Sequence, residues 1–251
     1  MDVLFLDAPY AGEVKLCSKT IFFLKKQKVK TVGLYASVQF CNNLDKVKEQ
    51  LKQLNIELIS SQPDRTHVQH QLLGCDNYHQ SLKLLPAQLE KIEYYLYIGD
   101  GKFHPLALVY GQKDKAVVNE IICNDPIAKT FQLLDQTYLK VILRKYRASL
   151  MKFLTADTIG VLVTIKPGQE QFRPSIFLEK KYPDKTFYYF IDNVISFDQL
   201  ENFPFIEVWV NTACPRVGFD DQEKFRRGVV NLNDAFQVKE ILGTNSVLNN
   251  I

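Results

Sequence analysis

Short apolar runs along the chain alternate with longer stretches in which hydrophobic residues recur at helical spacing. In the first half, two stretches have the spacing of amphipathic helices, Glu13–Lys26 and Leu44–Leu54. The runs rich in β-branched and aromatic residues are expected to form strands: Val3–Leu6, Thr31–Ala36, Ile56–Ile59, Tyr94–Ile98 and Ala116–Ile122. Strands that alternate with helices predict parallel sheets joined by right-handed crossovers.

The second half of the chain has the same alternating pattern. An amphipathic stretch, Leu134–Leu154, is expected to join two domains. Beyond it we expect a strand, a helix, two strands and a helix: Thr158–Ile165, Gln171–Lys181, Thr186–Ile191, Phe205–Asn211 and Asn231–Leu242. The predicted fold class is therefore α/β, with two similar small domains, each a parallel sheet flanked by helices. The expected domains are residues 1–140, with a loop around Cys75, and residues 141–251, with a loop around Cys214.

Composition narrows the class of protein. The chain has 251 residues, of which 46% are hydrophobic and 24% charged, as in ordinary folded proteins. No apolar run approaches the roughly 20 residues of a membrane span, and the first residues lack the basic start and long apolar core of a signal peptide. We therefore expect a cytoplasmic protein with no membrane segment. A net charge of +3 gives no reason to expect direct binding of nucleic acid.

Two of the five cysteines lie in segments expected to be irregular loops. Cys214 follows a predicted strand; Pro215 stops a ladder or helix from continuing, and Arg216 supplies a cation that favours a thiolate. Cys75 follows Gly74, which permits close approach of the backbone. In doubly wound folds such loops gather at the carboxyl ends of strands, where ligands bind. The sequence leaves open whether each thiol is a ligand, a reactive group or a buried structural residue.

Two further loops are expected to follow strands. Gly99–Leu108 contains a glycine-rich turn and His104; it either directs backbone N–H groups toward a polar or anionic ligand or forms a tight turn with a packing histidine. In the second loop, Lys166 and Gln169 either hold a carboxylate or are solvated turn residues. The sequence has no Walker loop, nucleophile elbow or His-Glu-x-x-His motif, so P-loop nucleotidase and triad-hydrolase functions lack their residues.

Together these loops resemble the iron-sulfur subunits of the 2-(3-amino-3-carboxypropyl)histidine synthase family, which begins diphthamide synthesis. The matching pieces occur in family order: Leu73–Asp76, Tyr97–Leu108, Asp125–Pro126, Thr164–Gln169, Phe203–Phe205, Ala213–Arg216 and Asp220–Asp221. The Gly-Asp-Gly-x-Phe-His-Pro-Leu and Ala-Cys-Pro-Arg blocks are specific. The resemblance covers the family's second and third domains, and we expect its first domain to have no counterpart here.

This resemblance implies an unconventional radical enzyme with a [4Fe-4S] cluster and S-adenosylmethionine as cofactors. In the family, three similar domains each supply one cysteine ligand, and the remaining iron meets S-adenosylmethionine. An electron from the cluster cleaves the bond between sulfur and Cγ of the methionine moiety, which gives methylthioadenosine and a 3-amino-3-carboxypropyl radical. That radical adds to C2 of a histidine imidazole on translation elongation factor 2. The cofactor supplies most of this chemistry, while the protein positions it and excludes water.

By position, the resemblance assigns site residues in both predicted domains. Cys75 and Cys214 match cluster ligands, and both have to be thiolates to bind iron. The methionine moiety is expected at the loop that contains Lys166, Gly168 and Gln169, with Gln169 favoured for its carboxylate. His104 and Asp220 are expected to line the pocket in roles that the sequence does not define.

Two thiolates are fewer than such a cluster normally has, and this leaves alternatives open. A third ligand comes from Cys17, Cys41 or Cys123, or from a second copy or a related chain that supplies the missing domain. Otherwise the chain is a non-catalytic subunit that supports a full-length partner. A further alternative keeps the radical chemistry but changes the acceptor. In every catalytic version the protein also needs an electron donor.

Overall fold

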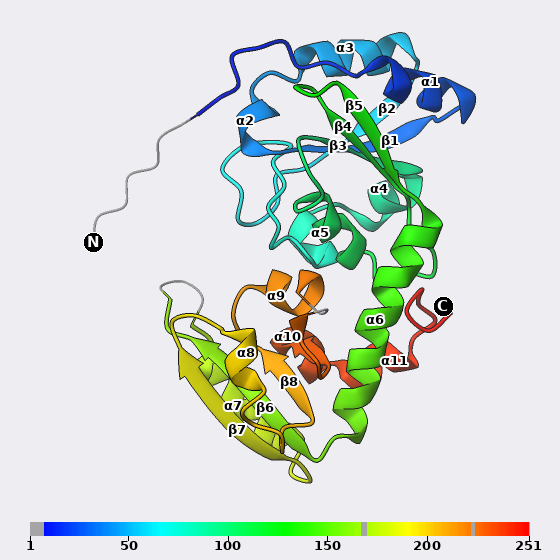
Figure 1. Ribbon diagram of the computed structural model, residues 1–251. Coiled ribbons are helices and arrows are strands. Elements are labelled where there is room, and N and C mark those ends of the chain that lie inside the picture. Colours follow the sequence, from blue (N-terminus) through cyan, green and yellow to red (C-terminus); the bar gives the residue numbers. More distant parts are fainter. Residues whose placement is uncertain (1–7, 167–169, 222–223, 251) are drawn as a thin grey trace. The chain divides into compact units, whose positions relative to one another are not determined.

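The chain forms two compact units, and the computed structural model describes residues 8–166, 170–221 and 224–250 (Figure 1). One unit consists of Met1–Gln112 and Val117–Leu139, and the other of Lys113–Ala116 and Lys140–Ile251. The long helix α6, Gln136–Thr155, begins in the first unit and continues in the second. The predicted strand Val3–Leu6 lies outside the described residues. Within those residues, no helix is both long enough and apolar enough to span a bilayer.

The first unit contains a five-stranded sheet in the order β2-β1-β3-β4-β5. Its strands are β1 (Thr31–Ala36), β2 (Glu57–Ile59), β3 (Tyr94–Ile98), β4 (Ile121–Asp125) and β5 (Thr130–Leu134). The first four are parallel, and β5 returns antiparallel to β4, which the sequence did not predict. The return follows from an Asx turn, in which the Asp125 carboxylate accepts the N–H groups of Ile127 and Ala128 at 2.8 and 2.9 Å.

Helices cover both faces of this sheet. They are α1 (Ser18–Lys26), α2 (Val38–Cys41), α3 (Asp45–Gln53), α4 (Pro86–Lys91) and α5 (Pro105–Tyr110), with a short 3-10 helix at His79–Leu82. Figure 1 shows α1 and α3 on one side of the sheet and α4 and α5 on the other. Val32 and Leu34 of β1 pack in one buried cluster with Leu24 of α1 and Leu51 of α3. Because strand side chains alternate, the buried Tyr35 faces the opposite side.

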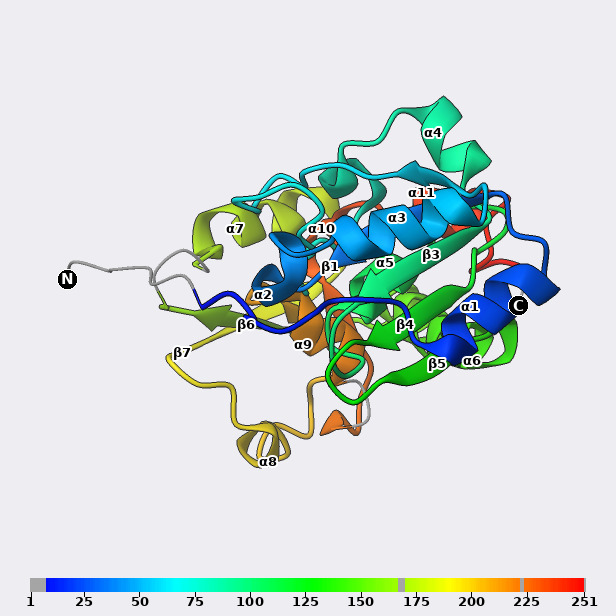
Figure 2. The same ribbon diagram turned by 90° about the horizontal axis from the view of Figure 1, so that it is seen from above.

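The second unit has a four-stranded, fully parallel sheet in the order β7-β6-β8-β9. Its strands are β6 (Thr158–Thr164), β7 (Thr186–Asp192), β8 (Val208–Asn211) and β9 (Val229–Asn231). The remaining helices are α7 (Phe172–Lys181), α8 (Phe197–Leu200), α9 (Pro215–Asp220), α10 (Leu232–Phe236) and α11 (Val238–Gly243). Figure 2 shows α7 and α8 on opposite sides of this sheet. The helix predicted over Asn231–Leu242 is therefore two short helices, and the short strand β9 was not predicted.

The two sheets share one strand order once the antiparallel β5 is set aside. In each, the second strand in sequence lies on one side of the first, and the third lies on the other. The α/β fold class is thus confirmed. In open α/β sheets, ligands bind outside the carboxyl ends of the strands at the point where the order reverses. In the first unit this point lies between β1 and β3, and in the second between β6 and β8.

Substitution of Gly160 tests the packing of the second sheet. A Cβ at this position of β6 would overlap the Trp209 ring, and Trp209 is itself only 2% exposed. We expect Gly160→Ala to lower the free energy of unfolding by about 1–3 kcal/mol, the usual cost of overpacking. Gly243→Ala is the control, because a Cβ there meets nothing within 4 Å. Urea denaturation of both variants measures the difference, and equal stability of the two would contradict the packing.

Candidate functional site

The Cys75 loop runs along the carboxyl edge of the first sheet. Gln71 forms a parallel bridge with Ala36, the last residue of β1. The N–H of Leu72 then donates to the carbonyl of Ala36 at 2.9 Å. These contacts place the segment that leads to Cys75 beside the carboxyl end of β1, on the side of β1 that faces away from β3.

Local hydrogen bonds fix the backbone on both sides of Cys75. The carboxylate of the buried Asp76 accepts the N–H of Leu73 at 2.8 Å, and the side-chain amide of Asn77 donates to the carbonyl of Gly74 at 2.9 Å. Burial raises the pKa of Asp76, although the Leu73 N–H opposes this. The Cys75 side chain is partly exposed and forms no disulfide. The loop therefore presents a thiol from an ordered backbone.

The loop after β3 brings His104 to the same place. A Cβ on Gly74 would lie 2.6 Å from Cε1 of Phe103, so the two loops touch at this glycine. The ring centroids of Phe103 and His104 are 5.2 Å apart and the rings are perpendicular. His104 in turn stacks on the buried Tyr97 of β3, with centroids 6.3 Å apart. The structure thus joins the predicted site residue His104 to the Cys75 loop through Phe103.

Cys214 lies at the carboxyl edge of the second sheet. It follows β8 and precedes Pro215, the first residue of α9. The backbone N–H and the hydroxyl of Thr212 both donate to the carbonyl of Leu162 in β6, at 3.1 and 2.8 Å, which holds the chain against the neighbouring strand. The Cys214 side chain is partly exposed.

Arg216, the cation nearest to Cys214 in sequence, has a carboxylate partner of its own. It is buried and forms an ion pair with Asp220, one turn further along α9. Burial raises the pKa of Asp220 to about 6, against the opposing effect of Arg216. The cation expected to favour a Cys214 thiolate is therefore paired with a carboxylate from its own helix.

The predicted methionine-binding loop leaves the same edge of the second sheet. Lys166 is exposed, and its N–H donates to the hydroxyl of Thr164 at 3.3 Å. Gly168 and Gln169 lie outside the described residues. Since β6 and β8 are adjacent and parallel, the loops that follow them lie on the two sides of the point where the strand order reverses.

The other three cysteines differ in accessibility. Cys41 and Cys123 are buried, and burial raises the pKa of each thiol to about 12. Cys17 is partly exposed, with Sγ 3.2 Å from the hydroxyl of Thr20. Three thiols of this chain are thus accessible enough to bind a metal. Over the described ranges, no three His, Cys, Asp or Glu side chains gather into a metal site.

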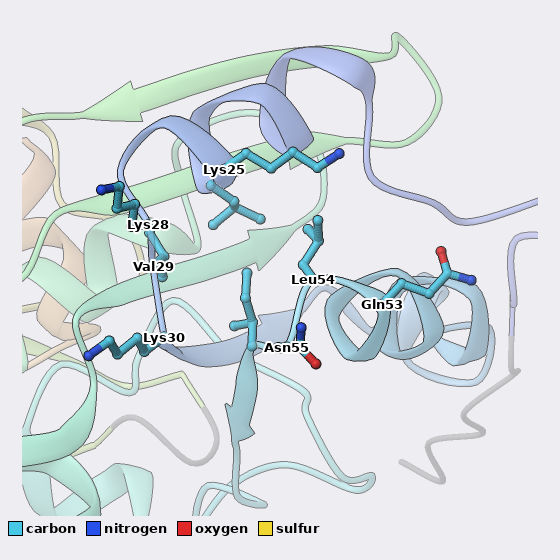
Figure 3. Close-up of a pocket in the computed structure, with 9 residues that line it drawn as sticks. Lys25, Lys28, Val29, Lys30, Gln53, Leu54 and Asn55 are labelled. Atoms are coloured by element: carbon cyan, nitrogen blue, oxygen red, sulfur yellow. The ribbon is translucent and has the colours of Figure 1, made fainter.

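Two pockets of the first unit were not predicted from the sequence. One, of about 1020 Å³, lies beside the Cys75 loop; its lining includes Leu73, Gln71 and Gln39. The other, of about 430 Å³, lies at the amino ends of β1 and β2 and is lined in part by Lys25, Lys28 and Lys30. Figure 3 shows that Lys28 and Lys30 extend to one side and Lys25 to the other, so these ammonium groups do not converge on one ligand.

Fold and loops together define an α/β protein that presents an accessible thiol at the carboxyl edge of each of two similar sheets. The family model for diphthamide synthesis proteins matches residues 1–244, and the chain belongs to this family. It is 31% identical over 220 residues to the 2-(3-amino-3-carboxypropyl)histidine synthase of Pyrococcus horikoshii. This match covers 82% of this chain and 59% of the relative.

Solved structures give the same result. The crystal structure of Dph2 from Pyrococcus horikoshii matches with a TM-score of 0.67 and 28% identity, over 90% of this chain and 61% of that one. A second crystal structure of that protein, with a 4Fe-4S cluster, matches with a TM-score of 0.67 and 29% identity, over 90% and 60% of the two chains. The chain thus spans about 60% of the length of these relatives.

Alkylation tests the accessibility of the five thiols. We expect iodoacetamide at neutral pH to modify Cys17, Cys75 and Cys214 in the native, metal-free protein, because burial and a raised pKa protect Cys41 and Cys123. Peptide mass spectrometry measures each site, and the urea-unfolded protein, in which all five react, is the control. Native labelling of Cys41 or Cys123 as fast as of Cys214 would contradict this assignment.

Proposed function

We propose that this chain takes part in the first step of diphthamide synthesis. The reaction is transfer of the 3-amino-3-carboxypropyl group of S-adenosylmethionine to a histidine of translation elongation factor 2. We propose that this takes place in the cytoplasm. One observation carries the proposal: Cys75 and Cys214 present partly exposed thiols at the carboxyl edges of the two sheets, and these are the cysteines that the family resemblance proposes as cluster ligands. The related Dph2 with a 4Fe-4S cluster supports it.

The two thiols fit a [4Fe-4S] cluster in chemistry and exposure. Iron takes thiolate ligands, and each of these sulfurs is accessible on a backbone held by hydrogen bonds. When bound, the cluster supplies the electron that cleaves the bond between sulfur and Cγ of S-adenosylmethionine. The protein's own part is to hold the thiolates, to orient the substrate and to exclude water.

Residues of the segment that follows β6 in the sequence are proposed to bind S-adenosylmethionine. The exposed ammonium of Lys166 is suited to a carboxylate, and we assign the same role to the amide of Gln169, with Gly168 allowing close backbone approach. His104 of the first unit and Asp220 of the second are each proposed as pocket residues. Because Arg216 already pairs with Asp220, that carboxylate adds little negative charge to a site for an anionic group.

A third cluster ligand and a reductant complete the proposal. Burial makes Cys41 and Cys123 poor ligands, whereas Cys17 is partly exposed. We propose that the third thiolate comes from a second copy of the chain or from a related chain, with Cys17 as the alternative within the chain. An external electron donor reduces the cluster in either assembly.

A second candidate function is a non-catalytic subunit. It is favoured by the family resemblance, which assigns two proposed ligands, Cys75 and Cys214, whereas the family's cluster has three cysteine ligands. In this version the chain supports or reduces the cluster of a full-length partner. The same pair of thiols also permits radical chemistry on a different acceptor.

Transfer of label tests the proposed activity. The anaerobic protein is incubated with dithionite, elongation factor 2 and S-adenosylmethionine labelled in its aminocarboxypropyl group. We expect labelled elongation factor and an equal amount of methylthioadenosine. Cys214→Ser should lower both by roughly 100-fold or more, as expected for loss of a metal ligand. Cys123→Ala is the matched control, because that thiol is buried, and it should keep most of the activity.

Each other outcome has a defined meaning. Methylthioadenosine without labelled elongation factor indicates a different acceptor. Products that form only after a three-cysteine relative is added indicate the supporting subunit. Full activity of Cys214→Ser would contradict the proposed ligand role.

A further inference from the structure

Two buried asparagines end adjacent strands beneath the Cys214 loop. Asn211 is the last residue of β8, Asn231 is the last residue of β9, and the two are paired in register. They are 1% and 2% exposed. The side-chain amide of Asn211 donates to the side-chain oxygen of Asn231 at 2.8 Å. Two polar side chains that are buried this completely require partners, and each has them.

The other partners of this asparagine pair are main-chain groups around the thiol. The Asn211 amide also donates to the carbonyl of Cys214 at 2.9 Å, and its oxygen accepts the N–H of Ala213 at 3.1 Å. The Asn231 amide donates to the carbonyl of Pro215 at 3.0 Å. The pair thus fixes the residue before Cys214, Cys214 itself and the residue after it.

Gly218 has no side chain, and this allows α9 to lie against the asparagine pair. A Cβ on Gly218 would overlap the side-chain amide of Asn231. The next residue, Phe219, packs edge-on against Tyr146 of α6, with ring centroids 4.6 Å apart. The helix that follows Cys214 is therefore seated directly on Asn231.

A second layer of buried polar groups holds Asn231 from behind. The Asn231 N–H donates to the Tyr146 hydroxyl at 3.4 Å, and that hydroxyl donates to the carboxylate of Asp234. The ammonium of the buried Lys113 lies 3.4 Å from the same carboxylate and 3.1 Å from that of Asp114. Burial lowers the pKa of Lys113, but the two carboxylates together raise it above its usual value, so Lys113 stays charged.

We propose that Asn211 and Asn231 are positioning residues for Cys214. Their amides hold the main chain on both sides of the thiol in a single conformation, and Tyr146, Asp234 and Lys113 hold Asn231 in place. Pre-organised ligands bind a metal more tightly than ligands on a mobile loop, because less ordering is needed when the metal binds. The role toward a cluster rests on the proposed function, whereas the fixed loop is a property of the metal-free chain.

The test uses the alkylation rate of Cys214 relative to that of Cys75 in the same metal-free protein. Cys75 lies in the other unit and is an internal reference. In Asn231→Ala and Asn211→Ala we expect this ratio to rise roughly 10-fold, which corresponds to about 1.4 kcal/mol of loosening. Hydrogen exchange at Val217, whose N–H donates to the Cys214 carbonyl, should rise in parallel.

Asn124→Ala is the matched control. Asn124 is also a fully buried asparagine near the end of a parallel strand, but it lies in the first unit and its amide oxygen accepts the N–H of Cys17. We expect this variant to leave the ratio unchanged. If Asn231→Ala fails to fold, Asn231→Ser replaces it, since its hydroxyl can still accept from Asn211 while the donor to Pro215 is lost.

A ratio within twofold of wild type in both folded Asn211 and Asn231 variants would overturn the proposal. Chemical reconstitution with iron and sulfide adds a second measurement. We expect the positioning variants to release iron to a chelator about 10-fold faster than wild type. If wild type takes up no iron, the cluster role fails together with the proposed function. The alkylation ratio still decides whether the asparagine pair fixes the loop.

Discussion

The central constraint in this protein is that the first strand of each sheet has a parallel neighbour on both sides. β1 pairs with β2 and β3, and β6 pairs with β7 and β8. A strand with a parallel neighbour on each side requires crossover connections that run in opposite directions along the sheet. The loops that leave this strand and its neighbour therefore diverge at the carboxyl edge of the sheet. In both units the sequence places its chemically distinctive residues at that edge. The Cys214 loop leaves β8 at this edge, and the Cys75 loop is held at the same edge of its own sheet by the bridge between Gln71 and Ala36.

Burial then separates thiols that look alike in the sequence. Cys123 belongs to a strand and Cys41 to a short helix against the core, and both are held protonated by their surroundings. Cys214 instead follows a strand, beyond the last ladder pair of β8. Its nearest cation in sequence, Arg216, is paired with Asp220. Access to the sulfur, together with a backbone held by buried asparagines, therefore makes Cys214 suited to binding a metal.

Much of the fold could be predicted, because the strands at the centre of a parallel sheet are continuous apolar runs. The predicted strands Thr31–Ala36 and Tyr94–Ile98 have the bounds that the structure shows. The short strand β9 was missed, since its three residues adjoin a stretch with helical spacing and give no periodicity of their own. The bond between Asn211 and Asn231 was equally out of reach, because it joins residues far apart in sequence through strand register. The loops that contain Cys75, His104 and Cys214 could be singled out by motif, but the contact between Gly74 and Phe103 that joins two of them depends on tertiary packing.

Iron and acid-labile sulfide content, measured after anaerobic purification and reconstitution, tests most directly whether the two thiols bind a cluster. The comparison is between wild type and the double variant Cys75→Ser, Cys214→Ser, with folding checked by circular dichroism. We expect a brown wild-type protein with iron and sulfide in equal amounts, about four of each per cluster. We expect less than about a tenth of that content in the folded double variant. Equal iron in the two folded proteins would contradict a ligand role for these two thiols.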